Sequence, residues 1–237
     1  NLDGCVQLND LLDLLSAYGD CAAEESAWQC GDLLAYQGYD YETVQIGEQC
    51  WFAENLRYLT EVVPVEIGSE DDGLPHSYVY GYDGYSPSAA MQTMNYSKYG
   101  VLYNHYAVDE WALCPEDWHV PSDDEFVVVG NSLGGRLVAG GKMKTIGVLE
   151  EETGEWLMPN EGATNSSGFN GMPGGERLMN QWNGISEVAR FWTSSTYEWN
   201  QDEGLFRSLW YAGEALSSQN GYHKRNAMSI RCIKDSE

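Results

Sequence analysis

The stretch Pro121-Ser-Asp-Asp-Glu-Phe-Val-Val-Val129 carries the clearest structural signal in the chain. Ser122 and Glu125 stand at the spacing of a capping box, in which the serine side chain accepts a hydrogen bond from the amide three residues later. The acidic residues after Ser122 would lie at the positive end of the helix dipole, and Gly134-Gly135 would end the helix. The pattern therefore predicts a helix that begins after Ser122 and ends before Gly134.

The sequence around this helix predicts an α+β domain with long, irregular loops. From Cys30 onward the chain is rich in glycine and aromatic residues, and turn signals such as Pro173-Gly-Gly175 and Asn220-Gly221 separate its short strand-like runs. Residues 59–98 are predicted to be a long loop excursion. Within it, tyrosines alternate as they do on one face of a strand.

The first part of the chain differs in composition from the rest. Residues 1–21 are rich in leucine, and the leucines between Leu8 and Leu15 follow the spacing of an apolar helix face. Residues 22–29 show no such period and are predicted to be a linker. We therefore divide the chain into a short helical segment over residues 1–21, a linker over residues 22–29 and a larger domain over residues 30–237.

The charge balance disfavours two classes of partner. The 237 residues include 12 Lys and Arg against 37 Asp and Glu, and the net charge of -25 opposes binding to nucleic acids and anionic membranes. No run approaches the roughly 18 consecutive apolar residues of a membrane helix, so we expect no membrane span. The apolar content of 43% is enough for one hydrophobic core.

Cysteine usage favours disulfide bonds over a metal site. The six cysteines include no Cys-x-x-Cys pair, and the chain has four histidines, so a zinc site is disfavoured. Disulfides persist in oxidising compartments. We therefore expect a secreted or cell-surface protein.

Six blocks of the larger domain occur in an order that is typical of one family. The blocks are Thr43–Arg57 (TVQIGEQCWFAENLR), Tyr99–Ala107 (YGVLYNHYA), Cys114–Glu125 (CPEDWHVPSDDE), Asn165–Gly175 (NSSGFNGMPGG), Phe191–Ser195 (FWTSS) and Ser229–Asp235 (SIRCIKD). Together they resemble the Fibrobacter succinogenes major paralogous domain family, over essentially all of residues 30–237. The resemblance implies a C-type-lectin-like fold, distantly similar to the formylglycine-generating enzymes, and it implies no well-established activity. The chain departs from the usual pattern at His105 and Phe126, where tryptophan is expected, and at Asp117, where glycine is expected.

The segment Asn1–Asp10 is similar to the latter part of a dockerin-type calcium loop and the start of its helix. Such loops place oxygen ligands at positions 1, 3, 5, 7 and 12, with glycine at position 6. With Gly4 at position 6, the calcium ligands would be Asn1, Asp3, the Cys5 carbonyl and Asp10. The alternative is a plain helix start that Asn9 or Asp10 caps. Dockerins carry two such repeats and one is found here, so a cohesin-like partner is not expected.

The even number of cysteines in the larger domain suggests two bridges, Cys30 with Cys50 and Cys114 with Cys232. Cys5 and Cys21 then remain for each other. They flank a helix of about ten residues, so both flanks would have to fold back for the two to pair. The alternative is a partner upstream of Asn1. Formylglycine-generating enzymes depend on a pair of reactive cysteines late in the chain. A bridged Cys232 cannot supply the thiolate for such chemistry.

The motifs that suggest catalysis lack the context that catalysis needs. Gly130-Asn-Ser132-Leu-Gly134 matches the nucleophile-elbow string, which needs a strand before its serine, whereas the capping box predicts a helix there. The four histidines show no metal-binding spacing, and we expect His119 to be a hydrogen-bonded structural residue. We therefore expect a protein that is not an enzyme.

Aromatic residues are the candidates for recognition. A surface for a glycan or a protein would consist of Tyr78, Tyr80, Tyr82, Tyr85 and Trp111, because such side chains combine a large contact area with a polar tip. The alternative is that the alternating tyrosines face the core of a sheet. We expect a binding or adhesion module that recognises a glycan or a surface protein through its loops. The alternatives are a structural subunit of an extracellular filament or surface layer, which binds copies of itself, and a formylglycine-generating-like enzyme.

Overall fold

The computed structural model describes residues 28–68, 70–218 and 221–236. The predicted calcium ligands Asn1, Asp3, Cys5 and Asp10 lie outside the described residues, and so do the leucine-rich helix and the expected Cys5–Cys21 pair.

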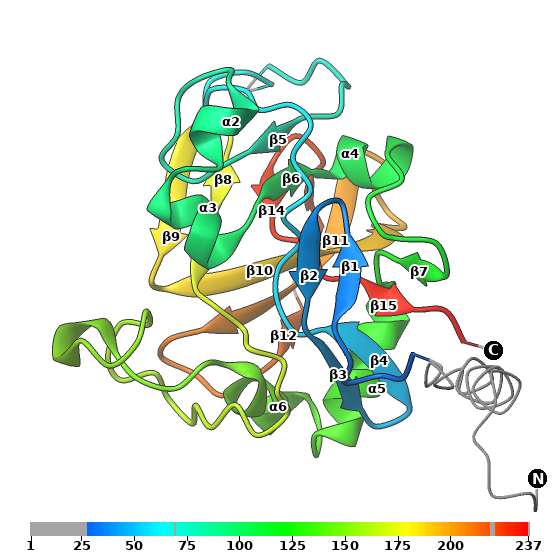
Figure 1. The fold of residues 1–237 in the computed structure, drawn as a ribbon, viewed down its shortest axis with the longest axis vertical. Coiled ribbons are helices and arrows are strands. Elements are labelled where there is room, and N and C mark those ends of the chain that lie inside the picture. The colour runs from blue at the N-terminus through cyan, green and yellow to red at the C-terminus, as the bar shows by residue number, and fades with distance from the viewer. Residues whose placement is uncertain (1–27, 69, 219–220, 237) are drawn as a thin grey trace, which may run out of the picture.

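The domain combines helices with three β-sheets in its described part, as the α+β prediction required (Figure 1). The largest sheet has nine strands in the order β12-β11-β10-β8-β14-β6-β5, with β13 beside β11 and β9 beside β8. Its strands are β5 (Ser77–Tyr78), β6 (Leu102–Asn104), β8 (Gly174–Leu178), β9 (Gln181–Ile185), β10 (Val188–Thr196), β11 (Glu203–Trp210), β12 (Ser217–Ser218), β13 (Tyr222–His223) and β14 (Ala227–Met228).

A smaller sheet brings the two ends of the domain together. Its order is β3-β4-β15-β7, so the last strand of the chain lies between two earlier ones. Gly47 stands in the tight turn between β3 and β4 at φ 62°, a conformation that glycine adopts without steric cost. The strands are β3 (Thr43–Ile46), β4 (Gln49–Phe52), β7 (Trp118–His119) and β15 (Ile233–Lys234), and a separate hairpin joins β1 (Leu34–Tyr36) to β2 (Tyr39–Tyr41).

Two disulfides fasten this smaller sheet. Cys30 is bonded to Cys50 in β4, and Cys114, just before β7, is bonded to Cys232, just before β15. Both predicted pairings within the larger domain are therefore confirmed.

The helix predicted from the capping box is α5 (Asp123–Ser132). The Ser122 side chain accepts from the Glu125 amide, and the Glu125 side chain accepts from the Ser122 amide, so both capping-box bonds are present. Gly134 and Gly135 follow at φ 97° and 100° and end the helix as predicted. The other helical elements are α2 (Pro87–Ala90), α3 (Met94–Tyr99), α4 (His105–Glu110), α6 (Arg136–Met143) and the 3-10 turn η1 (Leu149–Glu151).

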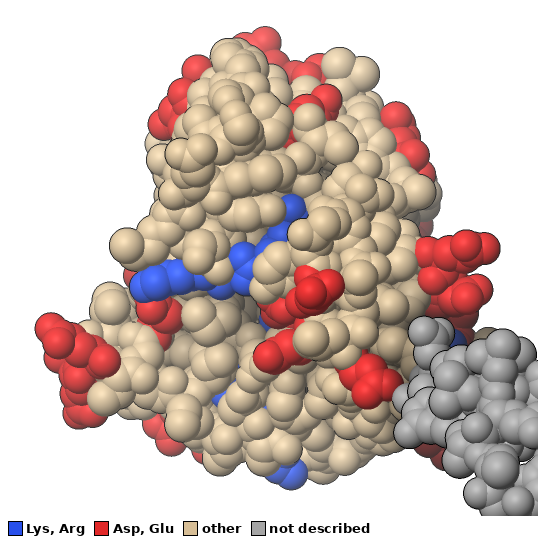
Figure 2. All heavy atoms as spheres, viewed as in Figure 1, with Lys and Arg blue, Asp and Glu red and all other residues tan. Residues whose placement is uncertain are grey.

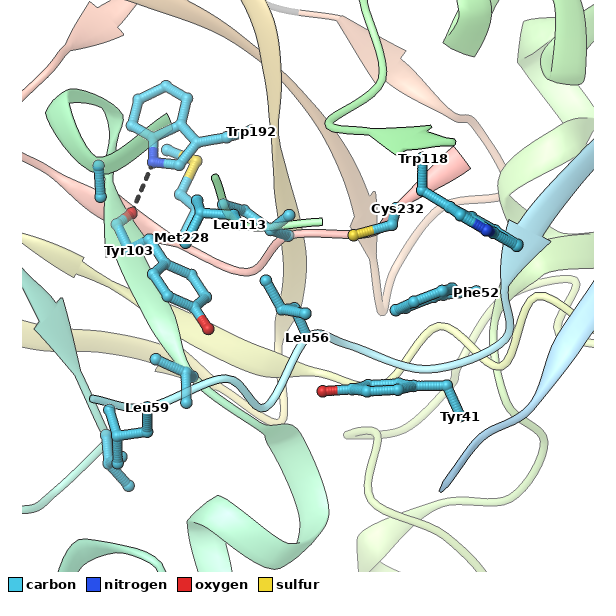
Figure 3. Packing of buried hydrophobic residues seen from close by; sticks show 14 of the residues in the cluster. Tyr41, Phe52, Leu56, Leu59, Tyr103, Leu113, Trp118, Trp192, Met228 and Cys232 are labelled. Carbon is cyan, nitrogen blue, oxygen red and sulfur yellow. Dashed lines mark hydrogen bonds between the residues drawn. The ribbon is translucent and has the colours of Figure 1, made fainter. Parts of the chain in front are cut away.

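The domain is filled by two large hydrophobic clusters. One lies between the hairpin β1-β2, β4 and the nine-stranded sheet, and its labelled members in Figure 3 include Phe52, Leu56 and Trp192. The Trp192 indole donates to the Tyr103 carbonyl at 2.8 Å, so its polar atom is satisfied inside the core. The second cluster gathers Phe126 of α5 with Trp51 and Phe191. Opposite faces of β10 therefore serve the two clusters, because Phe191 and Trp192 are adjacent.

Among the helices of the described residues, none combines the length and the apolar character needed to cross a bilayer.

Candidate functional site

The hairpin β10-β11 builds an open pocket at one end of its core-facing row. Cross-strand partners on this face are Trp192 with Phe206, then Arg190 with Ser208, then Val188 with Trp210. The three pairs share one face because side chains on a strand face recur every second residue. The first pair lies in the core, and the later pairs continue this row beyond it. They line a pocket of about 300 Å³, whose walls are Val188, Arg190, Ser208, Trp210 and Ser217.

Arg190 and Glu176 form a buried charge pair beside this pocket. Arg190 Nη1 donates to Glu176 Oε2 at 2.7 Å, and the Glu176 side chain is fully buried. Burial raises the pKa of Glu176 to about 7, although the Arg190 charge opposes this shift. Glu176 Oε1 and Arg190 Nε have no hydrogen-bond partner in the described part of the chain. Unsatisfied buried polar atoms are costly.

Trp210 supplies a half-exposed aromatic wall. Its side chain is 50% exposed, and its ring meets the Tyr211 ring edge-on with centroids 5.4 Å apart. Lys144 Nζ donates to the carbonyls of Trp210, Gly213 and Glu161 at 2.8–3.0 Å, so the backbone that carries the indole is tied to α6's C-cap. A backbone anchored in this way limits the conformational entropy that the pocket loses when a ligand binds.

The pocket combines the apolar Trp210 ring with polar groups that form no hydrogen bond within the described part of the protein. No described residue forms a hydrogen bond with the hydroxyl of Ser208 or Ser217, or with Arg190 Nη2. The Arg190 guanidinium also lies 5.2 Å from the centre of the Tyr222 ring, which restricts its position. Such a site suits a ligand that has both an apolar face and several hydroxyl groups.

A family model decides the membership of the chain. The model described as Fibrobacter succinogenes major domain matches residues 44–234. The chain belongs to this family. No curated protein and no solved structure matches it.

In this Fibrobacter succinogenes major domain, the three departures from the expected family pattern have simple physical explanations. Phe126 is fully buried and packs on Trp51 with ring centroids 5.0 Å apart. His105 is also buried, and its Nε2 lies 3.0 Å from the Thr193 carbonyl. Asp117 has φ 62°, the left-handed region where glycine is expected and where aspartate is among the better-tolerated alternatives.

The aromatic residues predicted as a recognition surface do not form a single surface. Tyr78 is fully buried, and its hydroxyl donates to the Ile67 carbonyl at 2.8 Å. Tyr78 therefore belongs to the core, which was the alternative reading of the alternating tyrosines. Tyr80 packs on Trp182 with ring centroids 5.2 Å apart, and Tyr82 packs on the first core cluster.

Tyr85 and Trp111 are more accessible but lie apart in the fold. Tyr85 is 67% exposed just before α2. Trp111 follows α4 and lines a separate hollow of about 520 Å³, together with Trp118 and His119. None of the four tyrosines lines that hollow.

His119 is a bridging residue between two elements. Its Nε2 lies 2.9 Å from Glu125 in α5 and its Nδ1 lies 2.5 Å from Asp235 after β15. Burial lowers the pKa of His119, but the hydrogen bonds with these two carboxylates outweigh it and raise the pKa above the usual value. This geometry fits the expected structural role. Ser132 ends α5 and donates to the Val128 carbonyl, so a helix precedes it, as predicted.

The residues of the Trp210 pocket were not among those selected from the sequence. The signal was the alternation in Val188-Ala-Arg-Phe-Trp192 and Phe206-Arg-Ser-Leu-Trp210, which places every second side chain on one face. In the described residues there is also no group of three His, Cys, Asp or Glu side chains that could hold a metal ion.

Proposed function

We propose that this domain is a non-catalytic glycan-binding module that receives a sugar ring in the Trp210 pocket. The observation that carries the proposal is a half-exposed indole beside the unused Nη2 of Arg190 and two serine hydroxyls that have no partner among the described residues. The apolar face of a pyranose ring would stack on Trp210. Its hydroxyls would accept from Arg190 and exchange hydrogen bonds with Ser208 and Ser217.

The sulfur chemistry supports binding rather than catalysis. Cys114 and Cys232 form a disulfide, and a bridged cysteine offers no thiolate for a formylglycine-type reaction. Two disulfides also support a secreted or cell-surface location.

A glycan array with the full chain tests the proposal. We expect retention on at least one neutral oligosaccharide, and Trp210→Ala should lower the affinity about thirtyfold or more, because a central tryptophan typically contributes about 2 kcal/mol or more to a binding site. The melting temperature should change little, because the side chain is half exposed.

Two variants serve as matched controls. Trp199→Ala removes a tryptophan that is 79% exposed and lines none of the pockets described above, so retention should be unchanged. Tyr85→Ala tests the loop surface predicted from the sequence. Binding that is lost in Tyr85→Ala but kept in Trp210→Ala would contradict the proposed site, and an absence of retention on every glycan would contradict the proposed function.

A further inference from the structure

A second pocket gathers cationic and amide groups from distant parts of the chain. It has a volume of about 260 Å³ and lies between β2, the segment after β4, and the end of α3. Its lining includes three of the twelve basic residues of the chain, Arg57, Lys98 and Arg231, together with Asn170. On the face drawn in Figure 2, Lys and Arg side chains gather near the centre, with acidic side chains at their margin.

Arg57 and Lys98 bring free N–H groups to the wall of this pocket. Arg57 uses Nε for Glu54 and Nη1 for the carbonyls of Tyr96 and Ser97, and no described residue accepts from its Nη2. Lys98 Nζ donates to Glu155 at 2.5 Å, and its side chain is partly exposed. An ammonium group has three donors, so Lys98 retains the capacity for a second acceptor.

Arg231 and Asn170 add donors from the interior side. Arg231 is fully buried, and no described carboxylate lies within ion-pair distance of it. Its Nη2 donates one bond to the Asn170 carbonyl at 3.0 Å, which leaves one N–H of that nitrogen unused. Asn170 Oδ1 accepts from Asn165, whereas Asn170 Nδ2 has no acceptor in the described part of the chain.

The acidic groups near the pocket do not use up these donors. Glu54 is already engaged by Arg57 and by the Tyr39 hydroxyl at 2.7 Å, and Glu155 is engaged by Lys98 and the Tyr99 hydroxyl. Glu42 also lines the pocket and is the one acid of this group without a side-chain hydrogen bond among the described residues. The pocket therefore holds four unused donor positions, and Glu42 is the acid of its lining that these donors do not engage.

We propose that this second pocket binds the carboxylate group of a small ligand. A carboxylate offers about four acceptor positions in one plane, and charge-assisted bonds to Arg and Lys are the strong ones. Arg57, Lys98, Asn170 and Arg231 would share these positions. The proposal is independent of the glycan site, because the two pockets have no residue in common.

Calorimetric titration of the full chain in 0.15 M NaCl tests this proposal. The probes are D-glucuronate and L-glutamate, which carry a carboxylate from two chemical sources, with D-glucose and sulfate for comparison. We expect saturable 1:1 binding of at least one carboxylate that persists in Trp210→Ala, whereas any heat from D-glucose should be lost in that variant. Lys98→Gln and Asn170→Asp should each lower the affinity at least tenfold, the second because it brings a negative charge to the pocket while keeping the acceptor for Asn165.

Matched variants keep the result interpretable. Lys234→Gln removes the same charge elsewhere, and Trp210→Ala removes the other pocket's indole, so both should bind the carboxylate like the native chain. Equal affinity in Lys98→Gln, Asn170→Asp and the native chain would overturn the proposal. So would the absence of saturable carboxylate binding, sulfate binding alone, or loss of carboxylate binding in Trp210→Ala.

Discussion

Three fully buried cations lie among oxygen atoms rather than beside carboxylates. Lys144 contacts three backbone carbonyls, Arg177 contacts three others, and Arg231 contacts three carbonyls and the Asn55 side chain. Burial lowers the pKa of Lys144 to about 8 and that of Arg231 to about 9. Each cation thereby satisfies backbone carbonyls that would otherwise be buried without a donor.

Replacing Lys144 by methionine should destabilise the protein. Three carbonyls would lose their donor, and an unsatisfied buried group costs about 1–3 kcal/mol, so we expect a loss of about 3 kcal/mol or more in the free energy of unfolding. Urea denaturation measures this. The neighbouring Lys142→Met is the control, because Lys142 donates to the single carbonyl of Leu133 and should cost about 1 kcal/mol. Equal effects of the two substitutions would contradict this role.

The buried Glu176 carboxyl should make stability depend on pH. Its pKa is raised to about 7 in the folded protein from 4.5, so between these values the folded state holds the extra proton. Stability is therefore greatest below pH 4.5 with respect to this group and falls as the pH rises toward 7, by up to about 3 kcal/mol.

The difference between the native chain and Glu176→Gln isolates this effect. His119, whose pKa is also raised, contributes stability that is present below its unfolded pKa and lost as the pH rises through its folded pKa, so it acts in the same direction. Glu176→Gln keeps an acceptor for Arg190 and leaves His119 in place. The free energy of unfolding should fall more between pH 5 and pH 7.5 in the native chain than in Glu176→Gln. An identical fall in the two proteins would show that Glu176 does not titrate in this range.

At the scale of elements, the long disulfide ties the last strand to the segment that carries α5. Cys114 and Cys232 are separated by 118 residues, and Cys30 and Cys50 by 20. In the chain-entropy model the longer loop gives the larger stabilisation, about 5 kcal/mol against about 3. We expect Cys114→Ser/Cys232→Ser to lower the free energy of unfolding more than Cys30→Ser/Cys50→Ser does. The reverse order in guanidinium denaturation would argue against this model.

The elements show why some features were predictable and others were not. The α5 helix follows from a local pattern, since its cap and stop are encoded within fourteen residues of one another, Ser122 to Gly135. The pocket is not local, because Glu176 meets Arg190 through the parallel pairing of β8 with β10. The tyrosine alternation also could not separate an exposed face from a buried one, and Tyr78 proved to be buried.

At the scale of the whole molecule, the six family blocks contact one another and stabilise the fold, but they do not form the Trp210 pocket. Arg231, in the last block, donates to Phe52 and Asn55 in the first block and to Phe169 and Asn170 in the fourth. No residue that lines the Trp210 pocket belongs to any of the six blocks. The resemblance could therefore predict membership of the family but not the position of this site.

The net charge of -25 should make stability sensitive to salt. Repulsion among surface carboxylates destabilises the compact state, and the screening length falls from about 30 Å at 0.01 M to about 8 Å at 0.15 M salt. We expect the melting temperature to rise when NaCl is raised between these concentrations. A melting temperature that falls would mean that attractive pairs outweigh the repulsion.

A heteronuclear NMR titration of the uniformly ¹⁵N-labelled chain with an oligosaccharide selected on the array tests directly whether Trp210 and Arg190 contact the glycan. We expect the indole N–H signal of Trp210 and the side-chain Nε–H signal of Arg190 to shift with saturation, while the indole signal of Trp199 stays in place. Saturable shifts at Tyr85 or Trp111 with no change at Trp210 would contradict it.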